Sequence, residues 1–252
     1  MLFALLAGPA TLAPAASHSQ TMTWIIDGVK RQAIVYAPSK ESAKAPLIFS
    51  FHGHGDDMQN FQGVGLQDFW PQAIVVYPQG LPTSRTGEPA LPGWQTSKGT
   101  YNDRDLKLVD EALASLRAKF QIDDARIYAT GFSNGAMFTY LLWAECPNVF
   151  AAFAPVAARL GPSVTLSVPK PLLHIAGQND QTIPFDAQKK AVEVARQVDG
   201  VSKKGENCGV NCTFYASASG SPVMTVFHPG GHEYPDGTSE TIVKFFKEHP
   251  LH

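Results

Sequence analysis

Residues 131–135 read Gly-Phe-Ser-Asn-Gly and fit the pattern G-x-S-x-G, which places a serine where it can act as a nucleophile. The residues before it, 126–130, are typical of a short strand, and those after it, 136–144, are typical of an apolar helix. Such a strand–turn–helix lifts the serine hydroxyl above a sheet and points the positive end of a helix at it. The two glycines allow the tight, strained turn. We therefore expect Ser133 to be a nucleophile for acyl transfer.

A serine hydroxyl is a weak nucleophile at neutral pH, so a base has to take its proton and a third group has to orient that base. In a strand–turn–helix site of this kind, the three groups follow the chain order serine, acid, histidine. The favoured base is His232, in a loop with two glycines after the last predicted strand, 223–227. The favoured acid is Asp180, in a turn after the predicted strand at 172–176.

Other histidines and aspartates are weaker candidates for these two roles. His228 lies at the end of the last predicted strand rather than in the loop, and Asp186 begins a predicted helix. His174 lies inside a predicted strand, which favours a core histidine. The structural alternatives for the favoured pair are a solvated loop histidine at 232 and an aspartate of an Asx turn at 180.

The stretch 51–55, Phe-His-Gly-His-Gly, supplies a third element. An oxyanion hole needs backbone N–H groups aimed at the developing negative charge. We expect one N–H from Asn134, directly after the nucleophile, and another from His54 in the glycine-rich turn. His52 and His54, with two aspartates close behind, could also suggest a metal site. The oxyanion role explains this turn, so we expect no metal and no cofactor.

Short apolar runs alternate with helical patterns along the chain, which predicts an α/β fold with a mainly parallel sheet and helices on both faces. Residues 21–26 and 31–36 flank Asp27-Gly28 and predict an antiparallel hairpin at one edge. No linker-like segment interrupts residues 17–252, so we expect one catalytic domain. Its site should lie at the carboxyl ends of the strands.

Composition limits the classes of partner. The chain has 252 residues, of which 44% are hydrophobic and 17% are charged, and its formal net charge is −2. No basic run favours a nucleic acid or an anionic membrane as partner. A small-molecule or polysaccharide-linked substrate and a monomer or simple homo-oligomer are expected.

The first 16 residues are apolar and then rich in alanine and proline, like the end of a secretory signal peptide. The pattern departs from a signal peptide because the first cationic residue is Lys30; we interpret the segment as a signal peptide whose start is missing. The alternative is a floppy, Ala/Pro-rich terminus. The apolar run is too short to span a bilayer. We expect a secreted protein, either extracellular or periplasmic.

The chain has three cysteines. Cys208 and Cys212 lie in a Gly/Asn/Lys-rich stretch that resembles a surface loop, where a disulfide would staple the loop and export would permit it. Cys146 beside the helix after the serine is interpreted as a buried thiol.

These features resemble the secreted α/β-hydrolase esterases of the polyhydroxybutyrate depolymerase-like and feruloyl/acetylxylan esterase group. The resemblance implies an α/β-hydrolase fold and an extracellular carboxylic-ester hydrolase. It further implies that Trp94, with Gln95 beside it, lines the acyl or sugar pocket; the alternative for Trp94 is an anchor for its loop. The matching stretches are 51–56, 93–95, 102–105, 131–136, 177–180 and 231–235.

The resemblance leaves several substrates open. A feruloyl ester of plant polysaccharide is favoured, and acetylxylan or a short-chain polyester is the runner-up. A catalytically silent hydrolase fold used for binding is the alternative of another class, and a peptidase is a further one. Residues 103–105, Asp-Arg-Asp, are interpreted as a helix cap with a local ion pair.

Overall fold

The computed structural model describes residues 18–39, 44–84 and 90–251; the expected signal peptide at 1–16 lies outside this range. The strands are β1 (His18–Ile26), β2 (Val29–Ala37), β3 (Ala45–Phe51), β4 (Ile74–Pro78), β5 (Leu81–Thr83), β6 (Leu91–Gly93), β7 (Ile122–Phe132), β8 (Ala152–Val156), β9 (Leu172–Gly177), β10 (Glu206–Gly209), β11 (Cys212–Tyr215) and β12 (Val223–His228). The α-helices are α1 (Met58–Phe61), α2 (Leu66–Phe69), α3 (Arg104–Lys119), α4 (Asn134–Glu145), α5 (Phe185–Asp199) and α6 (Thr238–Glu248), with 3₁₀ turns at Gln62–Val64 and Thr100–Asp103.

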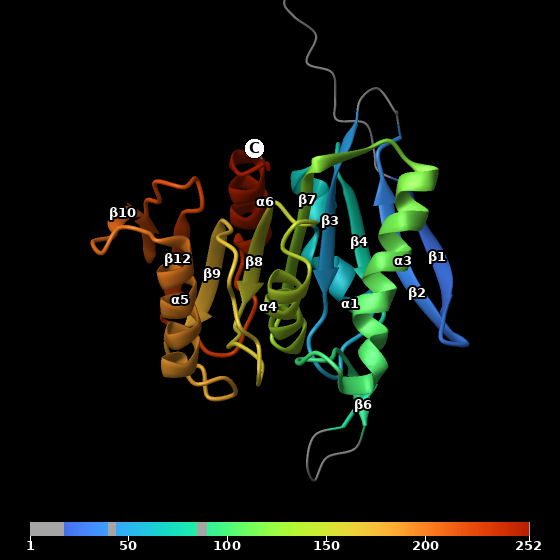
Figure 1. Cartoon of the computed structure of the whole chain (residues 1–252), viewed down its shortest axis with the longest axis horizontal. Coiled ribbons are helices and arrows are strands. Elements are labelled where there is room, and N and C mark those ends of the chain that lie inside the picture. Colours follow the sequence, from blue (N-terminus) through green and yellow to red (C-terminus); the bar gives the residue numbers. More distant parts are fainter. Residues whose placement is uncertain (1–17, 40–43, 85–89, 252) are drawn as a thin grey trace, which may run out of the picture.

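One 10-stranded sheet forms the centre of the molecule, in the order β1-β2-β4-β3-β7-β8-β9-β12-β11-β10 (Figure 1). Strands β4, β3, β7, β8, β9 and β12 are parallel to their neighbours in this series. The β1–β2 pair is antiparallel, with Ile26 opposite Val29. The predicted α/β class and the N-terminal hairpin at one edge are thus confirmed.

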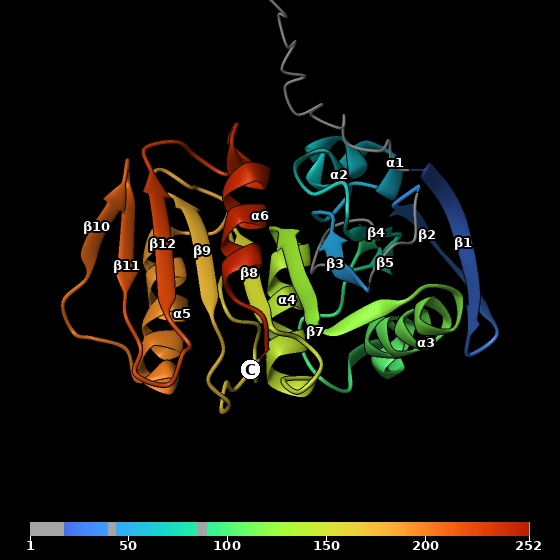
Figure 2. The ribbon, with the colours of Figure 1, turned by 90° about the horizontal axis from the view of Figure 1, so that it is seen from above.

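Helices cover both faces of the sheet (Figure 2). Helices α3, α4 and α5 lie on one face, and α1, α2 and α6 lie on the other. Alternate residues of a strand enter the two cores: Phe49 packs in the first, and Ile48 packs in the second. A sheet that is buried on both faces explains why its central strands read as continuous apolar runs.

The opposite edge of the sheet differs from the expectation of a surface loop around Cys208 and Cys212. This stretch forms the antiparallel hairpin β10–β11, and β11 pairs with β12. A polar, exposed edge strand lacks the apolar alternation that signals a strand, which is why the sequence pattern missed it. The expected disulfide between Cys208 and Cys212 is present and closes the hairpin.

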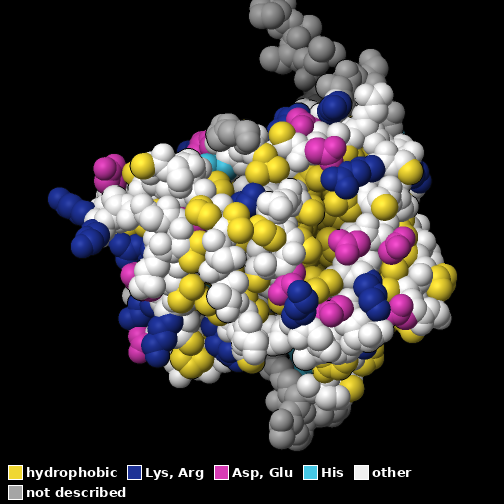
Figure 3. Space-filling view, viewed as in Figure 1, with side chains coloured by type: hydrophobic (Ala, Val, Ile, Leu, Met, Phe, Trp, Pro, Cys, Tyr) yellow, Lys and Arg dark blue, Asp and Glu magenta, His cyan; other side chains and the backbone are white. Residues whose placement is uncertain are grey.

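The surface agrees with the low net charge. On the face that carries α3, α4 and α5, Lys and Arg side chains are interspersed with Asp and Glu side chains (Figure 3). Within the described residues, no helix combines the length and the apolar character that a membrane crossing requires.

Candidate active site

Ser133 lies in the turn between β7 and α4, at the carboxyl end of a central strand. Its backbone adopts φ 54° and ψ −115°, a conformation that a residue with a side chain rarely takes. Its N–H donates to the carbonyl oxygen of Val156 at 2.9 Å, which ties the turn to the end of β8. The strained residue is therefore the predicted nucleophile itself, and its surroundings hold it in place.

The two glycines of the motif serve close packing rather than an unusual φ. Neither Gly131 nor Gly135 has a positive φ. A Cβ at Gly135 would collide with the carbonyl oxygens of Phe51 and His52, and one at Gly131 would lie 2.8 Å from that of Phe51. The glycines let the turn sit directly on the end of β3, where the expected oxyanion loop begins.

A continuous chain of hydrogen bonds joins Ser133, His232 and Asp180. The distance from His232 Nε2 to Ser133 Oγ is 2.8 Å, and the distance from His232 Nδ1 to Asp180 Oδ2 is also 2.8 Å. The three residues come from the loops after β7, β9 and β12, which lie close together in the sheet. The structure therefore brings together the three residues that the sequence assigned to nucleophile, acid and base.

Both oxygens of the Asp180 carboxylate accept hydrogen bonds from the groups around them. Oδ1 accepts the N–H groups of Thr182 and Ile183, both at 2.8 Å. Oδ2 accepts the side-chain amide of Gln188 at 2.9 Å, in addition to His232. Because the Asp180 side chain is fully buried, these donors replace the water that an ionised carboxylate needs. The Asx-turn geometry and the contact with His232 are thus present together.

Sequence reasoning missed Gln188. It lies in α5, is fully buried, and holds Asp180 with one amide hydrogen and the carbonyl oxygen of Ile183 with the other. A signal was available: Gln188 is three and four residues before Ala191 and Val192, so it falls on the apolar face of an amphipathic helix. A polar residue at such a position needs a partner.

The side chain of Asn134 is hydrogen-bonded to the backbone of Trp94, and its backbone N–H stands at the start of α4. Its Oδ1 accepts the N–H of Trp94 at 2.7 Å, and its Nδ2 donates to the carbonyl oxygen of Trp94 at 3.1 Å. Its own N–H is the first of α4 and has no acceptor within the helix. His54 and Asn134, the two expected oxyanion donors, line the same cavity.

Trp94 anchors its loop and also lines the cavity that contains His54 and Asn134. It is 1% exposed, its Nε1–H donates to the carbonyl oxygen of His52 at 2.9 Å, and its ring packs against Phe51 and Phe138. These contacts are those of the loop-anchor alternative, and the expected place in a pocket lining is present beside them.

Gln95 does not reach the cavity, contrary to the expectation that it contacts substrate. Its side chain is fully buried, its Oε1 accepts the N–H of Asp105, and its Nε2 donates to Asp103 Oδ1 at 2.8 Å. Asp105 in turn forms a buried ion pair with Arg31 at 2.8 Å. Asp103 provides no side-chain cap for α3. The expected side-chain cap by residues 103–105 is therefore wrong, since these residues join the loop to β2. The expected local ion pair is present between Arg104 and Asp105 at 3.9 Å.

His52 has both ring nitrogens engaged. The N–H of Gly80 donates to Nε2 at 2.9 Å, so the proton lies on Nδ1, which donates to the carbonyl oxygen of Gly53 at 2.7 Å. Burial lowers the pKa of His52 below its ordinary value, which keeps the ring neutral. His52 is a structural residue at the base of the turn that carries His54.

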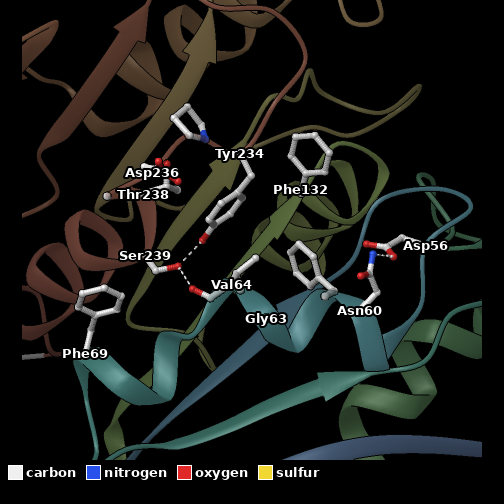
Figure 4. A pocket seen from close by; sticks show the side chains of 13 residues that line it. Asp56, Asn60, Gly63, Val64, Phe69, Phe132, Tyr234, Asp236, Thr238 and Ser239 are labelled. Atoms are coloured by element: carbon white, nitrogen blue, oxygen red, sulfur yellow. Dashed lines mark hydrogen bonds between the residues drawn. The ribbon is translucent and has the colours of Figure 1, made fainter.

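Two cavities are lined by residues next to Ser133 in the turn between β7 and α4. One, of about 510 Å³, is walled by Phe61, Phe132 and Tyr234, and Tyr234 is held through Ser239 (Figure 4). The ring of Phe132 lies 4.9 Å from the ring of His232, which connects this cavity to the triad. The other cavity, of about 700 Å³, is lined by His54 and Asn134. Asn134 directly follows Ser133 in the chain, whereas Phe132 of the first cavity directly precedes it.

No family model matches the chain. It is 33% identical to a bifunctional acetylxylan esterase/xylanase of Neocallimastix patriciarum over 63% of the chain and 22% of that protein. It is 23% identical to poly(3-hydroxyalkanoate) depolymerase C of Paucimonas lemoignei over 98% of the chain and 56% of that protein. A probable feruloyl esterase C of Aspergillus niger is 25% identical over 81% of the chain and 76% of its own length.

The chain is thus similar to esterases of the polyhydroxyalkanoate depolymerase, feruloyl esterase and acetylxylan esterase group. The fold agrees: an acetyl xylan esterase structure from Aspergillus awamori superimposes with a TM-score of 0.68 at 14% identity, over 91% of this chain and 99% of that one. The expected α/β-hydrolase fold is confirmed. The chain spans about a fifth of the length of the acetylxylan esterase/xylanase and about half of the length of the depolymerase.

Proposed function

We propose that this protein is a serine carboxylic-ester hydrolase that works through an acyl-enzyme. The observation that carries the proposal is the hydrogen-bonded series Ser133, His232 and Asp180, with 2.8 Å at each link. Ser133 Oγ attacks the ester carbonyl carbon while His232 Nε2 takes the serine proton. Asp180 accepts the Nδ1–H of His232, fixes its tautomer and stabilises the imidazolium without becoming protonated itself.

The remaining steps use the same groups. The N–H groups of Asn134 and His54 donate to the tetrahedral oxyanion. His232 then gives its proton to the leaving alcohol oxygen as the ester C–O bond breaks, which leaves an acyl group on Ser133. Water attacks this acyl-enzyme while His232 takes a proton from it, and the acid leaves as Ser133 regains its hydrogen.

The proposed substrate is a feruloyl ester of a plant cell-wall polysaccharide. Support comes from the similarity to proteins named feruloyl esterase C over about 80% of the chain. The aromatic-walled cavity beside His232 suits a hydroxycinnamoyl ring, because aromatic faces and edges pack well against one another. The cavity beside Asn134 is lined by hydroxyl groups, which suit a sugar.

An acetyl ester of xylan is the second candidate. It is favoured by the 33% identity to a protein named an acetylxylan esterase/xylanase. A short-chain polyester is a third substrate of the same chemistry, from the similarity to a poly(3-hydroxyalkanoate) depolymerase. Export of the protein belongs to the same proposal, and the Cys208–Cys212 disulfide supports it because disulfides persist in oxidising compartments.

The test is hydrolysis of methyl ferulate beside 4-nitrophenyl acetate by the wild type and Ser133→Ala. Release of ferulate by the wild type and its loss in the variant are expected. Cleavage of the acetyl ester alone would move the substrate to acetylated glycans or short polyesters. Folded wild type that cleaves neither ester would favour a silent binding protein or a peptidase.

A further inference from the structure

Beyond ester hydrolysis, we propose that the cavity beside Asn134 binds a carboxylate carried by the substrate, and that Arg159 is the residue that selects it. This inference rests on the proposed esterase function. It adds a substrate class, namely esters that bear a negative charge close to the bond that is cleaved. The polar lining favours an acidic sugar on the alcohol side of the ester.

The first observation is that a single arginine lines this cavity without a carboxylate beside it. The lining, as far as the structure describes it, contains Arg159 but no Asp or Glu. None of the ion pairs among the described residues involves Arg159. One guanidinium nitrogen, NH1, donates to the adjacent carbonyl oxygen of Leu160 at 3.0 Å. The guanidinium thus keeps donors for a planar anion such as a carboxylate.

The second observation is that the loop carrying Arg159 is fixed. A Cβ at Gly161 would collide with the carbonyl oxygen of Thr96, so the two loops touch backbone to backbone. Ser97 donates its hydroxyl to the carbonyl oxygen of Pro162. An arginine on a fixed loop loses less conformational freedom when it binds than one on a free loop.

The third observation places Arg159 close to the reacting bond. Asn134, Met137, which lies one turn further along α4, and Arg159 all line this cavity. Arg159 itself follows β8, whose last residue, Val156, accepts the N–H of Ser133. An ester whose carbonyl lies at Asn134 and His54 therefore shares one cavity with the guanidinium of Arg159.

The two cavities differ in charge. The cavity on the Phe132 side carries the carboxylates of Asp56 and Asp236 (Figure 4) and no Lys or Arg in its described lining. A substrate with one negative group is repelled by that cavity and attracted to Arg159. The difference orients the substrate as well as selecting it.

The remaining lining indicates what carries the charge. Five residues that carry hydroxyl groups line the same cavity: Thr83, Ser84, Thr96, Ser97 and Tyr101. Hydroxyl groups with a single cation match a polyhydroxylated acid, as in a uronic acid unit. A carboxylate on the acyl part would use the same arginine, so the test below separates the two sources.

The experiment compares two matched ester pairs. 4-Acetoxybenzoate and 4-acetoxybenzamide differ in a charge on the alcohol part, whereas 4-nitrophenyl hydrogen glutarate and 4-nitrophenyl pentanoate differ in a charge on the acyl part. The ratio of kcat/KM for the charged and the neutral member is measured for the wild type and Arg159→Gln. Comparing the two ratios cancels the intrinsic reactivity of each ester. Arg117→Gln, which removes the same charge at the far end of α3, is the matched control.

Arg159→Gln should lower the charged-to-neutral ratio at least about tenfold in one pair, mainly through KM, because a charge-assisted hydrogen bond is lost. A fall in the acetoxy pair identifies the alcohol part as the carrier, and a fall in the glutarate pair identifies the acyl part. Arg117→Gln should leave both ratios unchanged. Unchanged ratios in folded Arg159→Gln, or a drop of equal size in Arg117→Gln, would overturn the inference while leaving the esterase function intact. Folded wild type that cleaves none of the four esters would overturn both.

Discussion

The two ends of helix α5 each lie beside a buried aspartate, and the surroundings of the two carboxylates are opposite. Asp180, just before the helix, accepts hydrogen bonds from two backbone N–H groups, from Gln188 and from His232. Asp199, the last residue of the helix, accepts the N–H of Lys170 on Oδ1, and its Oδ2 has no partner among the described residues.

The surroundings of Asp199 determine whether its carboxyl group is charged. Burial raises the pKa of Asp199 to about 8, only partly opposed by its one hydrogen bond. The negative end of the helix also disfavours a charge there. At the other end, Asp180 accepts four hydrogen bonds, two on each carboxylate oxygen. The fold thus supplies a full set of donors to the carboxylate that the proposed mechanism uses, whereas the carboxylate at the other end of α5 receives one.

The largest expected effect comes from replacing Asp180, the carboxylate with the full set of hydrogen-bond donors. Asp180→Asn should lower kcat by about 10⁴-fold, because an amide leaves His232 in the wrong tautomer. Asp186→Asn is the matched control, since Asp186 is exposed and pairs only with Lys189. Steady-state kinetics on the better ester substrate measure both. A drop of less than tenfold in Asp180→Asn would remove Asp180 from the catalytic assignment.

The next effect tests the other end of the helix. Between pH 4 and 8 the folded protein keeps a proton on Asp199 that the unfolded chain has released, so the stability of the wild type falls as the pH rises through this window. Asp199→Asn removes that loss and should raise the free energy of unfolding by about 2 kcal/mol at pH 8 and by little near pH 4. Urea unfolding at several pH values measures it.

The control for this variant is Glu193→Gln, an exposed carboxyl on the same helix that pairs with Arg196. It should change stability by less than about 0.5 kcal/mol at any pH. A gain in Asp199→Asn that is the same at pH 4 and pH 8 would show that titration of Asp199 is not its cause.

The smallest effect concerns the positioning of Asp180. Gln188→Ala should lower kcat about tenfold with little change in KM, because one donor to the carboxylate is lost and the carboxylate and His232 become less well oriented. Gln188→Glu should cost more, since it places a second carboxylate against Asp180. If Gln188→Ala loses stability but keeps kcat, Gln188 is a packing residue only.

The parts of the site that could be predicted from sequence are those set by local chemistry. Ser133 is marked by its own strand, turn and glycines, and Asp180 and His232 each follow a predicted strand in a loop. Strands β7, β9 and β12 lie close together in a mainly parallel sheet, so the loops after them meet at the same edge and bring these three residues together. The central strands were equally clear, because burial on both faces leaves continuous apolar runs.

The parts that could not be predicted depend on partners far apart in the chain. Arg31 pairs with Asp105 across 74 positions, and no local pattern reports such a pair. No local pattern reports the partners of Gln95 either, because its buried side chain bonds Asp103 and the backbone of Asp105 in a later segment of the chain. The hairpin β10–β11 was missed because neither its exposed strand β10 nor its half-buried strand β11 shows apolar alternation.

The most direct test of the central claim is covalent labelling of the folded protein with a fluorophosphonate, read by intact mass and peptide mapping. A base-activated serine reacts, whereas an ordinary hydroxyl does not. We expect one adduct on Ser133, none in Ser133→Ala, and full labelling in Ser219→Ala, which removes an exposed serine outside the site. A folded wild type that takes up no label, or a label that persists in Ser133→Ala, would contradict the account of Ser133 as the nucleophile.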